Sequence, residues 1–208
     1  MRALLLVVIL SSAAGLVWLS ALHQTENGCP SPAATGRQVP TGGLDAVSPA
    51  PPQFTRVQVL NANGRLGEAA VIDGALAHLG FASTNTPAND PLHPDLDLRC
   101  YGEIRFGAAG QAAARTLSLA VPCAEFVRDV RPDSGIDLAL GTRFIALQPN
   151  DAARTALLDS AGLGRLRQVV PPHGGVAAQA GFPRTSITQS AVPVVDPSLI
   201  RRARQVTC

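Results

Sequence analysis

The sequence predicts an α+β fold, a two-layer sandwich in which helices cover one face of a mixed β-sheet, preceded by one transmembrane helix. An uncharged run at the N-terminus predicts the membrane helix, and strand-like and helix-like segments alternating from Phe54 onward predict the sandwich. At 208 residues the chain has room for one ordinary domain with accessory segments. We divide it into an anchor, a spacer, the α+β domain and a C-terminal extension with short helices, at residues 1–22, 23–53, 54–147 and 148–208.

The N-terminal segment is predicted to be a transmembrane anchor. Residues 3–22 carry no charge, and a helix of that length spans about 30 Å, the thickness of the hydrocarbon core. Arg2 precedes this run and the next arginine is Arg37, an asymmetry that favours a cytoplasmic N-terminus. A cleaved signal peptide is the alternative. Both interpretations place the rest of the chain outside the cytoplasm, and we expect a single-pass protein of the cell membrane with an extracytoplasmic C-terminal domain.

The segment after the anchor, residues 23–53, is predicted to be a flexible to semi-extended spacer. It is rich in proline, glycine and serine and shows no apolar periodicity. Such a composition does not bury enough surface to offset the entropy lost when the chain is ordered.

Periodicity and the positions of glycine and proline give the order βαβ-βαβ plus an extra strand for the α+β domain. The predicted strands begin with the run FTRVQVLN at Phe54 and continue at residues 81–86, 98–106, 125–130 and 136–140. Helices are predicted over residues 66–79 and 109–120, and a turn-rich loop over 89–95. In the extension we expect a helix over 151–163 and a last short helix that begins at Asp196 and Pro197.

Two glycine motifs repeat at the points where a strand hands over to a helix. The run from Gly64 to Ala70 aligns with the run from Gly107 to Ala113 at an offset of 43 residues. A helix N-terminus with free backbone N–H groups binds anions, which predicts an anion or polymer site at Asn61, Asn63, Gly64, Arg65, Gly67, Arg105, Gly107 and Gly110. The alternative is structural, because glycine also supplies tight turns and close approach of helix and sheet.

The cysteines predict disulfide bonds. All four, Cys29, Cys100, Cys123 and Cys208, follow the apolar run, and an even number outside the cytoplasm indicates disulfides. A strand from Cys100 climbs about 23 Å and the next helix returns about 18 Å toward Cys123. This arithmetic predicts a Cys100–Cys123 bond. Cys29 and Cys208 then remain, either to pair with each other or to bond another chain.

Composition and motifs exclude several classes of function. The formal charge is +2 and the 17 basic residues, all arginine, are scattered, so the chain has no basic stripe for nucleic acid. It has no cysteine or histidine spacing typical of zinc sites, and no GxSxG or SxxK motif. We therefore expect no cofactor, no metal and no catalytic residue. An enzyme remains the alternative, and its cleft would need converging charges such as those of Arg65, Arg105 and Asp97.

Three stretches carry a resemblance to a known family. The runs RVQVLNANGR from Arg56, LGF from Leu79 and IDLALG from Ile136 resemble the C-terminal domain of LytR/CpsA/Psr-type proteins, the LytR_C domain. The runs 87–91 and 105–112 and the terminal cysteine are similar to those of actinobacterial envelope integrity proteins. The resemblance implies membrane-anchored extracytoplasmic proteins without established catalytic residues, and the phosphotransferase domain of full-length LytR/CpsA/Psr proteins has no counterpart here.

On this basis we expect a non-catalytic protein that maintains cell-envelope integrity. Its expected partners are cell-wall polymer or wall-assembly membrane proteins. The alternative is an enzyme that transfers or hydrolyses a lipid-linked cell-wall glycopolymer.

Overall fold

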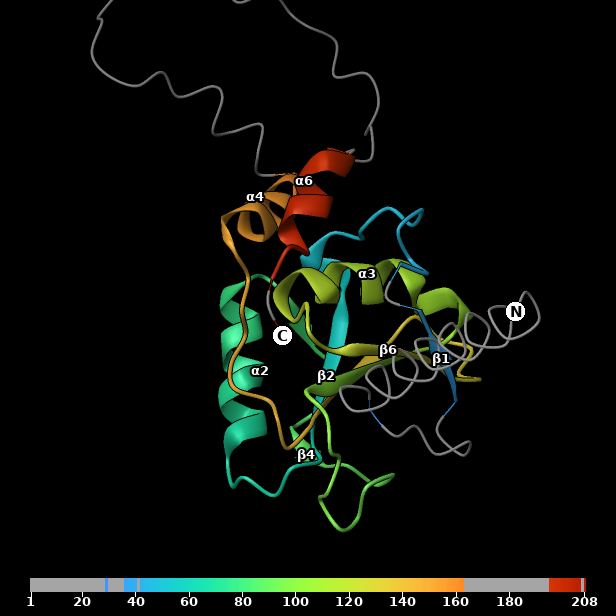
Figure 1. Ribbon diagram of the computed structural model, residues 1–208, viewed down its shortest axis with the longest axis vertical. Helices are drawn as coiled ribbons and strands as arrows, with labels where there is room; N and C mark the ends of the chain where they lie inside the picture. Colours follow the sequence, from blue (N-terminus) through green and yellow to red (C-terminus); the bar gives the residue numbers. More distant parts are fainter. Residues whose placement is uncertain (1–28, 30–35, 41, 163–194, 207) are drawn as a thin grey trace, which may run out of the picture.

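The computed structural model describes residues 29, 36–40, 42–162, 195–206 and 208. In this part of the chain helices pack on a mixed β-sheet, and the predicted α+β fold is confirmed (Figure 1). The predicted anchor at residues 1–22 lies outside the described residues, as do residues 23–28 and 30–35 of the predicted spacer. Within the described residues, no helix is both long and apolar enough to cross a bilayer.

The sheet contains parallel and antiparallel neighbours in the order β1-β6-β5-β7-β2-β3, with β4 also paired to β2. The strands are β1 Arg37–Val39, β2 Arg56–Asn61, β3 Ala82–Ser83, β4 Ala88–Asn89, β5 Gly102–Phe106, β6 Glu125–Arg128 and β7 Ile136–Leu140. Strand β2 runs parallel to β7, and β5 parallel to β6, whereas β5 and β7 are antiparallel. We call the end of the sheet that holds Gly102 and Leu140 the proximal end, and the end that holds Phe106 and Ile136 the distal end.

The outer edge of β2 differs from the prediction of one strand over residues 81–86. Two short strands, β3 and β4, pair with successive parts of β2. Pro87 lies between them, and proline lacks the backbone N–H that a continuous ladder needs. The chain therefore leaves the sheet and returns to it, and Asn89, predicted to open a loop, belongs to β4.

Two helices cover one face of the sheet. Helix α2 spans Glu68–His78, and helix α3 spans Gln111–Ala120 directly after a 3-10 turn, η2, at Ala108–Gly110. Alternate residues of the strands face these helices and form the main core with them. The central members are Val57, Val59, Ile104, Phe106, Leu138 and Leu140 from the sheet, Ile72 and Leu76 from α2, and Leu117 from α3.

The opposite face of the sheet carries a smaller apolar cluster. Leu60 and Ala139 are register partners on β2 and β7, and strand alternation turns them away from the helices. The segment 90–101 packs over them through Leu98, whose N–H donates to the Ala62 carbonyl at 3.0 Å. Strand β5 begins at Gly102 and not at Leu98 as predicted, because residues 98–101 form this cover.

The predicted spacer is wrong for residues 36–40 and 42–53, which belong to the folded domain. Strand β1 pairs antiparallel with β6, and Leu44 is 2% exposed in the main core. The Ala50 N–H donates to the Ala112 carbonyl of α3 at 3.2 Å. A 3-10 turn, η1, follows at Pro52–Phe54 and brings the chain to β2. The composition of this segment concealed its folding, because its contacts are with distant residues and leave no local period.

The C-terminal extension adds two helices to the same core. Helix α4 spans Asp151–Ser160 and α6 spans Pro197–Ala203, and they lie side by side next to α3 (Figure 1). The Asp196 carboxylate accepts a hydrogen bond from the Ser198 N–H at 2.8 Å, so the predicted cap of the last helix is confirmed. Ile200 and Leu157 are buried among the residues of the main core.

All four cysteines form disulfides, but the predicted pairing is wrong. The bonds are Cys29–Cys100 and Cys123–Cys208. Cys100 lies just before β5 and Cys123 just before β6, so both are at the proximal end, as the length arithmetic predicted. However, Cys100 turns to the face that carries Leu60 and Ala139, whereas Cys123 follows α3 and meets Cys208 after α6, on the helix side of the sheet. The length arithmetic correctly predicted the end of the sheet at which both cysteines lie, but it gave no information about the face of the sheet on which each cysteine lies.

This pairing can be checked by non-reducing peptide mapping of the purified chain. We expect cross-linked peptides that contain Cys29 with Cys100 and Cys123 with Cys208. Because the bonds close loops of 71 and 85 residues, each is worth about 4–5 kcal/mol in the chain-entropy model, and reduction should lower the melting temperature steeply. A peptide that joins Cys100 to Cys123 would contradict the structure.

Candidate functional site

The first glycine motif forms a closed, hydrogen-bonded turn at the proximal end. Asn61, at the end of β2, is buried, and its side-chain oxygen accepts from the N–H groups of Asn63 and Gly64 at 3.1 and 3.0 Å. Gly64 and Gly67 have φ angles of 78° and 76°, which favour glycine. Gly67 precedes α2 without a side-chain cap. The sequence of this turn is therefore explained by its backbone geometry.

The polar side chains of this turn bind other parts of the same chain. Asn63 donates to the Gly141 carbonyl at 3.1 Å, at the end of β7. Arg65 donates to the carbonyl of Phe144 at 2.7 Å and to that of Thr142 at 3.2 Å. The two side chains join the β2–α2 connection to the chain that leaves β7. Of the predicted anion-binding residues, Asn61, Asn63 and Arg65 are thus brought together, and each has partners within the chain.

The N-terminus of α2 already has an anion. The Glu68 carboxylate accepts from the Asn63 amide at 2.6 Å and from Arg65 at 3.1 Å. It lies in the first turn of α2, where the partial positive charge of the helix stabilises a carboxylate. We did not predict from the sequence that Glu68 neutralises the start of α2, although it lies within the first glycine motif. The signal was an acidic residue directly after the last glycine.

The second glycine motif has a different physical basis. Gly107 and Gly110 have negative φ angles, so neither needs glycine for its backbone conformation. A Cβ atom on Gly107 would lie 2.0 Å from the Arg131 carbonyl oxygen, and one on Gly110 would lie 3.2 Å from the Phe106 Cβ. Both glycines permit close approach of the connection after β5 to its neighbours. This motif lies at the distal end, about 13 Å along the strands from the first.

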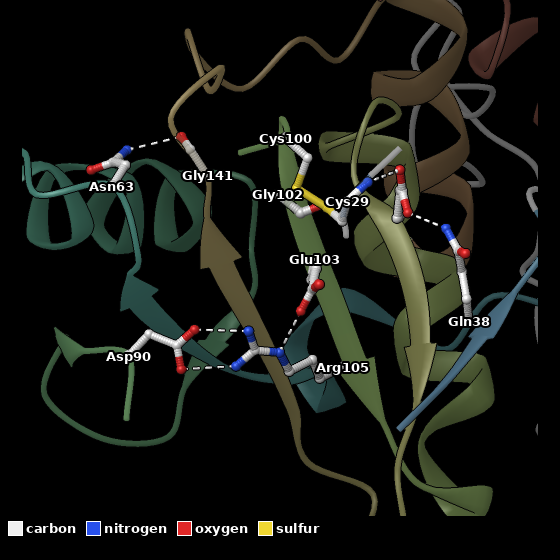
Figure 2. The surroundings of a disulfide bond; sticks show 10 residues. Cys29, Gln38, Asn63, Asp90, Cys100, Gly102, Glu103, Arg105 and Gly141 are labelled. Atoms are coloured by element: carbon white, nitrogen blue, oxygen red, sulfur yellow. Dashed lines mark hydrogen bonds and ion pairs between the residues drawn. A yellow bond between two sulfur atoms is a disulfide. The ribbon is translucent and has the colours of Figure 1, made fainter. Parts of the chain in front are cut away.

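Arg105, predicted as an anion ligand, is buried in a charge network with two acidic residues. Its guanidinium donates to both carboxylate oxygens of Asp90 at 2.8 and 2.7 Å, and its Nε donates to Glu103 at 2.8 Å. Figure 2 shows the side chain crossing from β5 toward Asp90 on the face without helices. Burial lowers the pKa of the Arg105 guanidinium, but Asp90 and Glu103 outweigh this effect and hold it above its ordinary value. Arg105 is therefore partnered and 1% exposed.

A second carboxylate, that of Glu125, lies next to Glu103 of this network. Glu103 and Glu125 are register partners on β5 and β6. One oxygen of Glu125 accepts from the Cys29 N–H at 2.6 Å and the other accepts from the Gln38 amide, a chain of contacts that leads to the disulfide in Figure 2. The second oxygen of Glu103 is buried without a partner among the described residues. Burial raises the pKa of Glu125, its hydrogen bonds from Cys29 and Gln38 lower it, and the charge of Glu103 raises it further, with a net upward shift.

The residues proposed for an enzyme do not converge. Arg65 lies at the proximal turn, Arg105 is enclosed by Asp90 and Glu103, and Asp97 is exposed on the segment that covers the sheet. The Asp97 carboxylate has His93 as its neighbour at 4.0 Å. Among the described residues no cluster of three or more His, Cys, Asp and Glu side chains is arranged to hold a metal ion.

Arg105 should be essential to the stability of the fold. Replacing it with methionine keeps much of its apolar length but leaves Asp90 and Glu103 buried without a cation. We expect Arg105→Met to lower the free energy of unfolding by about 3–5 kcal/mol, measured by urea denaturation. The matched control Arg56→Met removes an exposed arginine and should change it by about 0.5 kcal/mol or less. Equal effects would show that the network contributes no more than a surface charge.

Glu125 should make stability depend on pH. Its pKa is higher in the folded than in the unfolded state, so its stabilising contribution is present below the unfolded value of 4.5 and is lost as pH rises through the folded value. Glu125→Gln keeps an acceptor for Cys29, and the Gln38 amide can rotate to accept from the new side chain. We expect the melting temperature of this variant to fall less than that of the unmodified chain between pH 4.5 and neutrality.

The control for this prediction is Asp95→Asn, which removes an exposed carboxylate from the segment over the sheet. It should leave the pH dependence unchanged. An unchanged slope in Glu125→Gln would contradict the upward shift at Glu125.

The family model that matches this chain covers both glycine motifs. Residues 55–144, which contain both glycine motifs, match the family model LytR_C, described as LytR cell envelope-related transcriptional attenuator. The chain is 50% identical over 121 residues to the cell envelope integrity protein Cei of Mycobacterium tuberculosis. This match covers 58% of the chain and 56% of that relative, so the chain spans about half the length of the curated relative it matches.

A solved structure shares the fold. The soluble domain of a conserved hypothetical secreted protein from Mycobacterium marinum superposes with a TM-score of 0.64 at 38% sequence identity. The superposition covers 84% of this chain and 99% of that domain. Residues 55–144 of the chain therefore form a LytR_C domain, and the chain belongs to the same family as this mycobacterial secreted protein.

Proposed function

We propose that this chain is a non-catalytic, membrane-anchored extracytoplasmic protein that maintains cell-envelope integrity by binding cell-wall polymer or wall-assembly proteins. The LytR_C domain at residues 55–144 and the name of the relative Cei support a role in the envelope. Two disulfides suit an oxidising compartment outside the cytoplasm. The uncharged run at residues 3–22 supports the anchor.

One observation carries the choice of a binding protein over an enzyme: the two arginines proposed for catalysis are engaged in contacts that hold the fold together. Arg105 donates three hydrogen bonds to Asp90 and Glu103, and Arg65 donates three to two carbonyls and Glu68. General acid–base or nucleophilic catalysis needs a titratable group within reach of a substrate atom. A group whose donors are already bound to its own chain is poorly placed to serve a substrate.

The test uses the full chain in detergent micelles and two assays. In the first, insoluble cell-wall material is sedimented with the protein, and we expect the chain to be retained in a saturable manner. In the second, lipid-linked polyprenyl phosphate substrates are incubated with the protein, and we expect no transfer or hydrolysis by mass spectrometry. The substitution Arg65→Ala should weaken the fold through its lost carbonyl contacts and reveal no activity to lose.

Two outcomes would count against the proposal. Turnover of a lipid-linked substrate that is lost in Arg65→Ala would favour the enzyme. A chain that neither sediments with wall material nor captures wall-synthesis enzymes from solubilised membranes would contradict both forms of the binding proposal.

A further inference from the structure

We propose that a cavity at the distal end, between β1, β6 and the start of α3, binds a phosphate group carried on a sugar or polyol of a wall glycopolymer. This inference rests on the proposed function, because it names the ligand and the site through which wall polymer is held. The residues that carry it are Arg37, Arg128 and Gln111, none of which has been assigned a role above.

The cavity has a volume of about 270 Å³ and an apolar floor. Phe106 and Leu44, both buried core residues, form the floor, and Arg37 and Arg128 line the wall. Gln111, in the first turn of α3, also lines the cavity, and its amide donates to the Ala108 carbonyl at 3.0 Å. The size of the cavity lies just below the usual range for pockets that bind drug-sized ligands, which suits one phosphate group with part of the sugar or polyol that carries it.

The two arginines are placed directly opposite each other. Arg37 and Arg128 are register partners in the antiparallel pair of β1 and β6, which places their Cβ atoms about 5 Å apart. Two positive charges in this position repel each other and destabilise the strand pair. Neither guanidinium has an ion-pair partner within the described part of the chain. The geometry therefore leaves a pair of unneutralised cations on the wall of a cavity.

The acidic residues near this cavity are committed elsewhere. Asp129 follows Arg128 in sequence, but its carboxylate binds Arg131 at 2.7 Å. Asp45 follows Leu44, and its carboxylate is shared by Arg115 at 3.1 Å and Arg204 at 2.6 Å. No carboxylate is among the residues that line the cavity. An anion that neutralises Arg37 and Arg128 has to come from outside the described chain.

Comparison of the two glycine motifs leads to the same result. In the alignment with an offset of 43 residues, Glu68 of the first motif corresponds to Gln111 of the second. Glu68 supplies the anion at the start of α2, whereas the first turn of α3 contains no acidic residue. At the first connection, the Glu68 carboxylate neutralises Arg65 and the positive end of α2. At the second, the cations and the positive helix end remain without an internal anion.

The chemistry of the site favours phosphate. An arginine side chain presents donors in a planar fork that binds phosphate oxygens in pairs, and two arginines match the several oxygens of one phosphate. Its place favours a polymer over the membrane surface. Cys29, the described residue closest to the predicted anchor, bonds Cys100 at the proximal end, so the cavity lies at the other end of the strands.

The first test titrates the full chain in detergent micelles with inorganic phosphate at constant ionic strength, replacing chloride. Two-dimensional NMR of arginine Nε–H groups reports binding, and we expect saturable shifts at Arg37 and Arg128. The double variant Arg37→Gln/Arg128→Gln should weaken phosphate binding about tenfold or more, because each arginine contributes charge-assisted hydrogen bonds. The control Arg56→Gln removes an exposed arginine at the distal end, outside this cavity, and should keep the unmodified affinity.

A stability measurement separates loss of the site from loss of the fold. Removing two like charges that face each other should leave the melting temperature of the double variant equal to or above that of the unmodified chain. An unaltered phosphate affinity in this folded variant, or the absence of saturable shifts at both arginines, would overturn the proposal.

The second test identifies the source of the phosphate. Wall material is compared before and after hydrofluoric acid treatment, which removes phosphodiesters, and phosphatidylcholine vesicles are compared with and without phosphatidylglycerol. We expect retention by untreated wall that falls on acid treatment and in the double variant. Retention by anionic vesicles alone would overturn the polymer as the source. Wall retention unchanged in the double variant would overturn this site and leave the proposed function standing. Phosphate binding at both arginines without any wall retention would overturn wall polymer as the ligand, and the proposed function would then stand only if the chain captures wall-assembly proteins.

Discussion

The ion pair between Arg105 and Asp90 is the constraint on which the open face of the sheet depends. This face has no described helix, and the irregular segment 90–101 covers it. This irregular segment buries little apolar area against the sheet. A stronger, directional interaction is therefore needed to hold Asp90 against β5. The bidentate geometry supplies it. Ala139 on β7 is small and fully buried, which leaves room on this face for the guanidinium to cross.

Such a network specifies a position more than it adds stability. Moving three charges out of water is costly, and an apolar set of the same shape would often be as stable. A buried arginine, however, accepts only an arrangement in which its donors meet acceptors, and this fixes the segment after β4 relative to β5. Glu125, the register partner of Glu103, accepts from the Cys29 N–H and so extends the network toward the Cys29–Cys100 bond. Chain order, charge and disulfide are therefore coupled on this face.

The elements that the sequence predicted well are those with a local signal. Strand β7 matches its prediction over Ile136–Leu140, and α2 and α3 agree within two residues because their apolar residues repeat at helical spacing. Strand β1 was missed because three residues at a sheet edge carry no period. Its pairing with β6 joins residues that are far apart in sequence, for example Gln38 and Val127. The disulfide error has the same origin. Strand length gives the end of a sheet, but the face depends on where Cys100 leaves the ladder.

At the candidate site, the sequence predicted which two strand-to-helix connections carry the glycine motifs. It did not predict why each connection needs glycine or which charges surround it. Two motifs with the same glycine spacing differ in backbone: Gly64 and Gly67 adopt positive φ, whereas Gly107 and Gly110 remove Cβ atoms from a crowded contact. One substituted position, Glu68 against Gln111, decides whether the helix start is neutralised from within. The partners that distinguish the two, Arg37 and Arg128, come from strands that no local pattern links to α3. Only tertiary structure could bring them together.

In the membrane-anchored chain proposed above, the disulfides determine how the domain carries a pull on its N-terminal side. A pull that enters the domain through Cys29 passes across the Cys29–Cys100 bond to the start of β5, which lies between β6 and β7 in the interior of the sheet. The short edge strand β1 and the segments between Cys29 and Cys100 are outside this covalent path, so they bear no direct load. On the other side, Cys208 is bonded to Cys123 just before β6, which is the next strand to β5. Both covalent connections meet the sheet at its proximal end and leave the distal end, with its unneutralised arginines, free of them.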